Sequence, residues 1–195
     1  MLETKGTGQL VIVSGPSGAG KSTVLRRLVK DCPLPLELSV SATTRPPRPA
    51  EINGVEYHFL SQEEFDVKLA NGDFLEHKEV FGRGHLYGTL KESVTTGLNA
   101  GCYVILEIDV AGAMSVLEHI PDAITIFIHP GSQQELENRL RGRETESEES
   151  IIRRLEVAIS EMDLMDRYQH IIVNEQPKTA AETICQILKN SGASS

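Results

Sequence analysis

The sequence lacks long apolar runs and has few cysteines. No run of about eighteen apolar residues is present, and no apolar segment of a secretion signal appears, so we expect neither a membrane span nor export. The cysteines, Cys32, Cys102 and Cys185, are odd in number and far apart. We therefore expect buried free thiols in a reducing compartment, and hence a cytoplasmic protein, rather than a disulfide framework.

Basic patches and metal-ligand spacings are also missing. The formal net charge is −9 and no lysine-rich patch offsets it, which disfavours a nucleic acid partner and favours a small anion held by a few arginines. The histidines and cysteines do not follow the spacings of structural metal sites, so we expect none. Repeats and low-complexity tracts are absent, and 195 residues suit one domain with small insertions.

The most informative stretch that is present is a glycine-rich loop, Gly15-Pro16-Ser17-Gly18-Ala19-Gly20-Lys21-Ser22. It follows an apolar run at 10–13 and precedes a helical pattern at 23–29. The spacing G-x-x-x-x-G-K-[ST] between a strand and a helix predicts a phosphate-binding loop, because glycines let backbone N–H groups turn inward and the helix N-terminus adds partial positive charge. We expect Lys21 to reach the β- and γ-phosphates of a nucleotide and Ser22 to ligate Mg²⁺.

A second anion site is predicted in the proline-rich segment 41–59. Its prolines exclude a regular helix and hold Arg45 and Arg48 on a stiff, extended path. Guanidinium groups presented in this way are suited to bidentate capture of a phosphate. The alternative interpretation is a solvated loop whose arginines have no ligand.

The remaining pattern alternates strands with helices, which predicts an α/β fold with a parallel sheet wrapped on both faces. Asp109 ends one apolar strand and is expected at the ligand crevice, because strand carboxyl ends face it. Three arginines, Arg139, Arg143 and Arg154, fall within one predicted helix–loop–helix, which suits a mobile lid that brings cations to a transferring phosphoryl group. The expected strands cover 10–13, 36–40, 102–109, 123–128 and 169–174, with an extended segment at 74–81 and a turn at 82–89; the expected helices cover 61–72, 90–99, 110–119, 133–141, 147–165 and 177–189.

These features together resemble the guanylate kinase family, from about Gln9 to Lys189. The most specific part runs from Ser39-Val40-Ser41 through Thr43-Thr44-Arg45-x-Pro47-Arg48, with Glu51, Gly54 and Tyr57-x-Phe59. The glycine-rich loop, Leu106-x-Ile108-Asp109 and Arg143-x-Thr145-Glu146 also match. The resemblance implies a P-loop nucleoside monophosphate kinase fold in a single domain, 1–195. It further implies a core at about 9–40, 100–135 and 165–190, an inserted GMP-binding lobe at about 41–95 and a helical lid at about 139–156.

The resemblance also implies roles for individual residues. ATP, the phosphoryl donor, is bound with Mg²⁺ on Ser22 by Gly15, Pro16, Ser17, Gly18, Ala19, Gly20, Lys21, Ser22, Thr23, Arg139, Arg143 and Asn174. GMP is bound by Ser41, Arg45, Arg48, Tyr57, Glu76, Tyr87, Thr89 and Asp109, and the transfer step itself is assisted by Lys21, Arg45, Arg143 and Arg154. A carboxylate such as Glu76 can accept from the adjacent N1–H and N2–H₂ donors of guanine, whereas adenine presents an acceptor at N1.

The implied reaction is ATP-dependent phosphorylation of GMP, and more weakly of dGMP, by a monomer or homodimer that binds neither nucleic acid nor membrane. Four positions depart from the usual family pattern: Ala50, Thr89, Glu107 and Ala111. We expect Ala50 and Ala111 to adjust affinity rather than abolish turnover, because neither removes a phosphate or base ligand. Two alternatives remain at this point: a guanylate-kinase-like module that binds peptides, and a related kinase that acts on a sugar phosphate.

Overall fold

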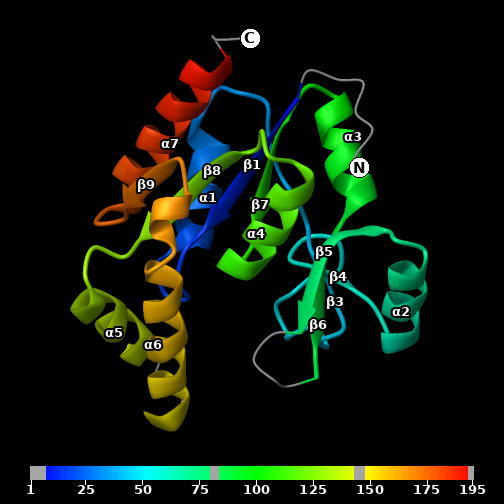
Figure 1. The fold of residues 1–195 in the computed structure, drawn as a ribbon, viewed down its shortest axis with the longest axis horizontal. Coiled ribbons are helices and arrows are strands. Elements are labelled where there is room, and N and C mark those ends of the chain that lie inside the picture. The colour runs from blue at the N-terminus through cyan, green and yellow to red at the C-terminus, as the bar shows by residue number, and fades with distance from the viewer. Residues whose placement is uncertain (1–7, 80–83, 143–147, 193–195) are drawn as a thin grey trace.

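The computed structural model describes residues 8–79, 84–142 and 148–192, which form two sheets with helices around them (Figure 1). The larger sheet has five strands in the order β2-β7-β1-β8-β9, and every pairing within it is parallel. The strands are β1 (Gln9–Ser14), β2 (Leu36–Leu38), β7 (Tyr103–Glu107), β8 (Ile124–His129) and β9 (His170–Val173). The parallel sheet predicted from the sequence is confirmed.

The central strand β1 is buried on both faces, because its side chains alternate between two hydrophobic cores. Val11 and Val13 pack with α1 (Lys21–Asp31) and α7 (Pro177–Gly192). Leu10 and Ile12 pack on the opposite face with α3 (Lys91–Asn99) and α4 (Val110–His119). A strand covered on both sides is apolar throughout, as the sequence pattern indicated.

The smaller sheet has the order β4-β3-β6-β5. Its strands are β3 (Ala42–Thr43), β4 (His58–Phe59), β5 (Phe74–Glu79) and β6 (Leu86–Leu90), and α2 (Gln62–Ala70) covers it. The Ser61 hydroxyl accepts from the Glu64 N–H while the Glu64 carboxylate accepts from the Ser61 N–H, which confirms the predicted capping box. Phe65 of α2 stacks on Phe74 with ring centroids 4.3 Å apart and anchors the helix to the sheet.

The prediction of a turn at 82–89 is wrong for its second half, because residues 86–90 form strand β6. This strand pairs antiparallel with β5 on one side and with β3 on the other. Gly88 is needed here for close packing: a Cβ at this position would lie 2.8 Å from the Phe74 ring. Gly88 was therefore mistaken for a turn glycine, although it is a strand glycine that makes room for the neighbouring strand.

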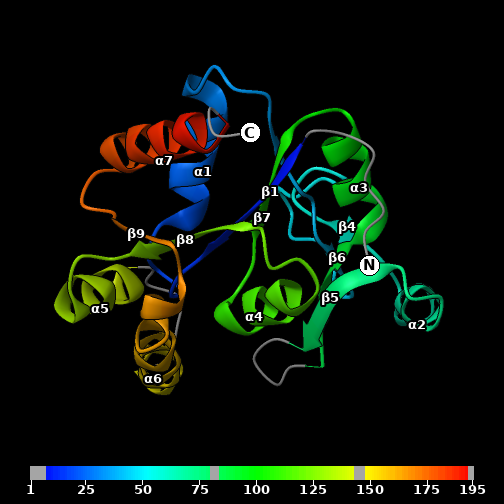
Figure 2. The ribbon, with the colours of Figure 1, turned by 45° about the horizontal axis from the view of Figure 1, so that its top comes forward.

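Two more helices and a short turn complete the described fold. The helix α5 (Gln133–Arg141) has the predicted bounds, and α6 (Glu148–Met162) is shorter than predicted, since a separate 3₁₀ turn, η1 (Met165–Arg167), follows it. Figures 1 and 2 show α6 and the smaller sheet projecting from the same end of the core, with α4 between them. Among the described residues, no helix combines the length and apolar character needed to cross a membrane.

The cysteine prediction is wrong, because Cys32 and Cys185 form a disulfide that joins the end of α1 to α7. The two residues are 153 positions apart in the sequence, but α1 and α7 lie side by side on one face of the sheet. Only Cys102 is a free thiol, and it is half-buried. The odd cysteine count therefore reflected one bridge and one unpaired residue.

Candidate active site

The phosphate-binding loop connects β1 to α1 and has the backbone geometry that the motif requires. Gly15 has φ 139°, and a Cβ there would lie 2.2 Å from the Ile128 carbonyl oxygen of β8. Gly20 is the N-cap of α1 in the left-handed conformation, with φ 84°. Because both positions exclude a side chain, the loop can turn tightly and leave the helix N-terminus open towards a ligand.

The predicted phosphate-binding lysine lies over this loop. Lys21 Nζ donates to the carbonyl oxygens of Gly15 at 2.6 Å and Pro16 at 3.2 Å. The Ser22 hydroxyl, one residue on, donates to Glu107 Oε1 at 2.7 Å. A hydroxyl beside a carboxylate is an oxygen donor set that fits Mg²⁺, which keeps several waters and also takes ligands from the substrate phosphates. The described residues contain no cluster of three or more His, Cys, Asp or Glu side chains that would hold a metal by themselves.

A cavity of about 630 Å³ opens next to the loop, between the large sheet, the small sheet and α6. Its lining includes Lys21, Ser22 and Glu107 from the larger sheet and the loop beside it, and Glu76, Tyr57 and Tyr87 from the segment that carries the smaller sheet. Its lining comprises Gly15, Ser17, Lys21, Ser22, Leu38, Ser39, Val40, Ser41, Val55, Glu56, Tyr57, Glu76, Lys78, Tyr87, Gly88, Glu107, Ile108, Asp109, Arg154, Val157 and Glu161.

All three base-reading residues implied by the resemblance line this cavity, and two of them, Glu76 and Asp109, lie close together. Glu76 lies on β5, and its Oε1 accepts from the hydroxyl of the buried Thr89 at 2.6 Å. Asp109 caps α4, with Oδ1 accepting from the Gly112 N–H at 2.8 Å. Burial raises the pKa of Glu76, and the nearby Asp109 carboxylate raises it further, while the hydrogen bond from Thr89 opposes both effects.

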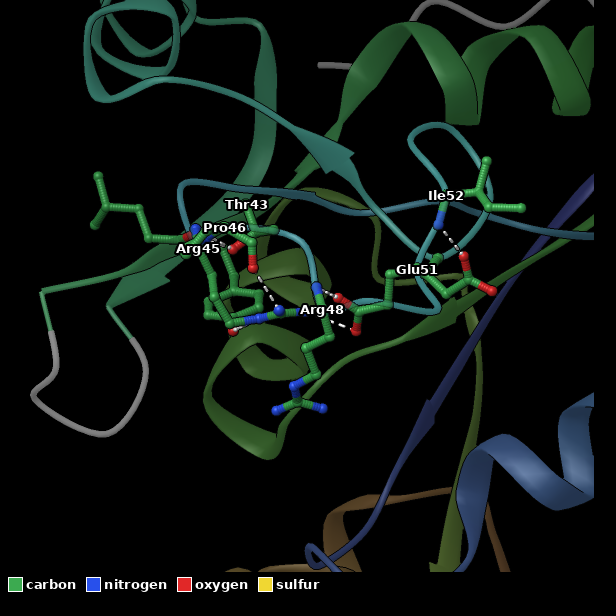
Figure 3. Close-up of polar contacts among 9 residues, drawn as sticks. Thr43, Arg45, Pro46, Arg48, Glu51 and Ile52 are labelled. Atoms are coloured by element: carbon green, nitrogen blue, oxygen red, sulfur yellow. Dashed lines mark hydrogen bonds and ion pairs between the residues drawn. The ribbon is translucent and has the colours of Figure 1, made fainter.

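The two arginines of the proline-rich segment are held differently from each other. Arg45 Nη2 lies 2.9 Å from Glu51 Oε1, and Arg45 Nε donates to the Tyr87 hydroxyl at 3.2 Å. Arg48 is exposed, and its guanidinium projects away from Glu51, which Arg48 contacts through its backbone N–H at 2.8 Å (Figure 3). Neither arginine lines the cavity, although Arg45 contacts two tyrosines that do, at 5.4 Å from the Tyr57 ring centroid and through the Tyr87 hydroxyl.

Of the three predicted lid arginines, Arg139 and Arg154 are among the described residues and Arg143 is not. Arg154 of α6 lines the cavity and donates from Nη2 to the Ser17 hydroxyl at 2.6 Å. Arg143, with Thr145 and Glu146, lies outside the described residues, so its predicted role stays a prediction. Arg154 thus connects the helix α6 directly to the phosphate-binding loop.

Arg139 and Asn174 contact the phosphate-binding loop from a side that does not line the cavity. Arg139 donates to the carbonyl oxygens of Ala19 at 3.4 Å and Asn174 at 2.9 Å, while the buried Asn174 amide donates to Ala19 at 2.7 Å. The observed contacts brace the loop where it enters α1.

Sequence reasoning missed three charged residues that line the cavity, Glu56, Lys78 and Glu161. Lys78 Nζ lies 2.7 Å from Asp109 Oδ2. Burial raises the pKa of the Glu161 carboxyl, an effect that Lys21 opposes and Asp109 reinforces. Glu161 could have been found from helical periodicity, because Arg154, Val157 and Glu161 recur at the spacing of one helix face. Strand alternation places Lys78 on the same face as Glu76, but its pairing with Asp109, 31 residues away, had no local signal.

Known proteins resemble this chain over nearly its whole length. The family model described as guanylate kinase matches residues 7–191. A guanylate kinase of Rhodopirellula baltica is 60% identical over 95% of this chain and 90% of its own length, and one of a Nostoc species is 46% identical over 91% and 88%. The crystal structure of the guanylate kinase of Anaplasma phagocytophilum has a TM-score of 0.77 and 32% identity, with 97% of this chain and 88% of that chain covered.

A sugar kinase structure from a Janibacter species shares the fold alone, with 15% identity and a TM-score of 0.50 over 95% of this chain and 97% of that chain. The family model covers nearly the whole chain, and the matches to the two named relatives cover most of each relative's length. The chain belongs to the guanylate kinase family.

Proposed function

We infer that this protein transfers the γ-phosphoryl group of ATP to GMP, and we assign its cleft residues to the two substrates. The observation that carries this assignment is a single cavity lined both by the phosphate-binding loop and by carboxylates and tyrosines suited to a nucleotide base and phosphate. We propose the core at about 9–40, 100–135 and 165–190, the GMP lobe at about 41–95 and the lid at about 139–156.

On the donor side, we propose that the loop N–H groups and Lys21 hold the ATP phosphates. Ser22 and Glu107 would hold Mg²⁺, which supplies charge neutralisation on the phosphates when bound. Arg154 already reaches Ser17 of the loop and is therefore placed to meet the donor phosphates. We also propose that Arg139 and Asn174, which contact the Ala19 carbonyl, bind ATP as predicted. Arg143 and the remaining loop residues keep their predicted roles.

On the acceptor side, we propose that Glu76, Ser41 and Asp109 receive the guanine, with Thr89 orienting Glu76. The phosphate of GMP would contact Tyr57, Tyr87, Arg45 and Arg48. The hydrogen bond from Arg45 to Tyr87, which lines the cavity, supports the assignment of Arg45. Arg48 is exposed and does not line the cavity, so the assignment requires that its side chain or the whole lobe moves towards the cavity when GMP binds.

Transfer needs little covalent chemistry from the protein. A phosphate oxygen of GMP is already a competent nucleophile, so no general base is required. The protein has to place the two phosphates in line and spread the developing negative charge over Lys21 and the arginines. Closure also excludes water, which would otherwise hydrolyse ATP.

The setting of the reaction is a further part of the proposal. We propose a cytoplasmic monomer or homodimer that also accepts dGMP more weakly than GMP and has no nucleic acid partner. The Cys32–Cys185 disulfide does not follow from a reducing compartment. Counting free thiols in protein taken directly from cells under thiol-blocking conditions tests whether this bond exists there.

Steady-state assays with ATP and a panel of AMP, GMP, UMP and CMP test the function. We expect turnover with GMP and inhibition by a metal chelator. The variant Lys21→Ala should lose about 10³-fold or more in kcat, because Lys21 acts on the transferring phosphoryl group, and should still bind GMP. Lys30→Ala, at the exposed far end of α1, is the control and should behave like the wild type. Normal turnover by Lys21→Ala, or no GDP formed by the wild type, contradicts the proposal.

A further inference from the structure

Lys78 forms an ion pair that crosses from the smaller sheet to the core. It lies on β5, two residues after Glu76, and its Nζ is 2.7 Å from Oδ2 of Asp109, the N-cap of α4. Both partners line the cavity. The other oxygen of Asp109 accepts a hydrogen bond from the Gly112 N–H, so both carboxylate oxygens have a partner. The assignment of residues to ATP and GMP leaves this cation without a role.

The surroundings of the pair are rich in negative charge. From β5 and α4, Glu76 and Asp109 face the same end of the cavity, with His77 beside Glu76 in the chain. From α6, Glu161 faces Asp109, Lys78 and, from α1, Lys21. Thr89 of β6 contributes only a hydroxyl, and burial raises the pKa of Tyr168 to about 12, so that this phenol is neutral near pH 7. Lys78 is thus the ammonium group in contact with Asp109 at this acidic end.

A guanine base makes that charge balance necessary. Its N1–H and N2–H₂ donors are best received by ionised carboxylates, but two carboxylates that face one base repel each other in a partly buried site. An ammonium group in contact with one of them offsets this repulsion. An ordinary exposed ion pair would contribute little, whereas this pair fixes a side chain that lines the substrate cavity.

We propose that Lys78 is a positioning residue for the acceptor base: its ammonium group orients the Asp109 carboxylate and balances its charge, so that Glu76 and Asp109 can both receive guanine. The proposal rests on the assignment of the guanine to these two residues. It adds a residue that determines GMP affinity without itself taking part in phosphoryl transfer. The expected consequence of removing Lys78 is weaker GMP binding, with the donor site unaffected.

The test compares Lys78→Met, which keeps the length of the side chain, with Lys78→Arg, which keeps the charge. Lys68→Met is the matched control, because Lys68 belongs to the same lobe, lies outside the cavity and has only a 4.0 Å ion pair with Asp73. We expect Lys78→Met to raise the KM for GMP about tenfold, with the KM for ATP and kcat within about twofold of the wild type. Lys78→Arg should restore most of the GMP affinity, and Lys68→Met should behave like the wild type.

The pH profile adds a readout that a purely structural role would not move. Without Lys78, the unbalanced Asp109 charge raises the pKa of Glu76 further, so kcat/KM for GMP should begin to fall at a higher pH than in the wild type as the solution is acidified. We expect this acid limb to shift upwards by about half a pH unit in Lys78→Met and to stay in place in Lys68→Met. Melting temperatures of all variants show whether each one is folded.

Three results would overturn the proposal: an unchanged KM for GMP with an unmoved acid limb, equal losses for GMP and ATP, or an arginine variant as impaired as the methionine variant. Failure of the proposed function gives a different result, because the wild type itself would then fail to phosphorylate GMP. If the function holds and Glu76 and Asp109 do not receive the base, Asp109→Asn would leave the KM for GMP unchanged, and the role of Lys78 falls with that assignment.

Discussion

Single residues in the cavity are tuned by neighbours that are distant in the sequence. Glu76 is a partly buried carboxylate that receives the Thr89 hydroxyl and faces Asp109. Its pKa is raised, mainly by burial. An ionised carboxylate in such a place reduces the stability of the folded protein, because folding favours the protonated form. In the proposed function, the hydrogen-bond donors of bound guanine compensate for this loss of stability.

Glu76→Gln is expected to separate activity from stability. The amide presents donors where guanine also presents donors, so the KM for GMP should rise by about 100-fold or more. Because the pKa of Glu76 is higher in the folded than in the unfolded protein, its carboxyl lowers the stability of the wild type as the pH rises from the unfolded-state pKa through the folded-state pKa. The variant should therefore be at least as stable as the wild type at pH 7. It should show no such gain at a pH below both pKa values of Glu76, that of the unfolded and that of the folded state.

Kinetic assays and urea unfolding at the two pH values check this prediction. A variant that binds GMP normally would contradict the role in base recognition. A variant less stable than the wild type at pH 7 would contradict the argument from burial.

The sequence suggested these residues unevenly. Lys21, Ser22 and Asp109 were predicted from local patterns, because a motif or the end of an apolar strand marks each of them. Glu76 was implied only by the family resemblance, and Lys78 and Glu161 were not predicted at all. Their significance depends on the approach of β5 and α6 to the end of the large sheet, which no local pattern encodes.

Among the structural elements, the phosphate-binding loop depends most on contacts behind it. Gly20 has φ 84°, and a Cβ there would lie 2.6 Å from the Asn174 amide nitrogen that holds the Ala19 carbonyl. A substitution at Gly20 would therefore strain the backbone and also displace the side chain that braces the loop.

Gly20→Ala should raise the KM for ATP about tenfold or more and lower stability by about 1–2 kcal/mol. Gly72→Ala is a matched control, because Gly72 also has positive φ, 73°, but a Cβ there meets nothing within 4 Å. The control should show a similar backbone cost in thermal unfolding and an unchanged KM for ATP. Equal effects of both substitutions on ATP binding would show that the bracing contact is unimportant.

Element boundaries followed from the sequence where a side chain marks them. The capping box of α2 and the Asp109 cap of α4 are such signals, and α4 and α5 begin and end as predicted. The strand β6 was missed because Gly88 accommodates Phe74 of the neighbouring strand, a requirement that exists only after the strands pair.

For the whole molecule, the Cys32–Cys185 disulfide closes most of the chain into one loop. The residues are 153 positions apart, and by the chain-entropy relation a loop of this size stabilises the folded state by about 5 kcal/mol. The bond lies between α1 and α7, next to a cavity of about 280 Å³ that is separate from the substrate cavity. We therefore expect it to affect stability rather than catalysis.

A thiol reductant should lower the melting temperature of the wild type by about 10 °C or more and leave kcat nearly unchanged at 25 °C. Cys32→Ser should melt at the lower temperature and be insensitive to the reductant. Cys102→Ser, which removes the free thiol, should respond as the wild type does. Three titratable thiols in the unreduced native wild type would contradict the bond.

By itself, the sequence determined the strands of the larger sheet, most of the helices and the phosphate-binding loop. These depend on apolar periodicity, caps and glycine spacing, which act over a few neighbouring residues. Only the tertiary structure decided that Cys32 meets Cys185, that residues 86–90 form a strand, that Arg45 is held by Glu51 and Tyr87, and that Lys78 pairs with Asp109. The physical reason is that most of these contacts join groups tens of residues apart, whose proximity exists only after the sheets have formed.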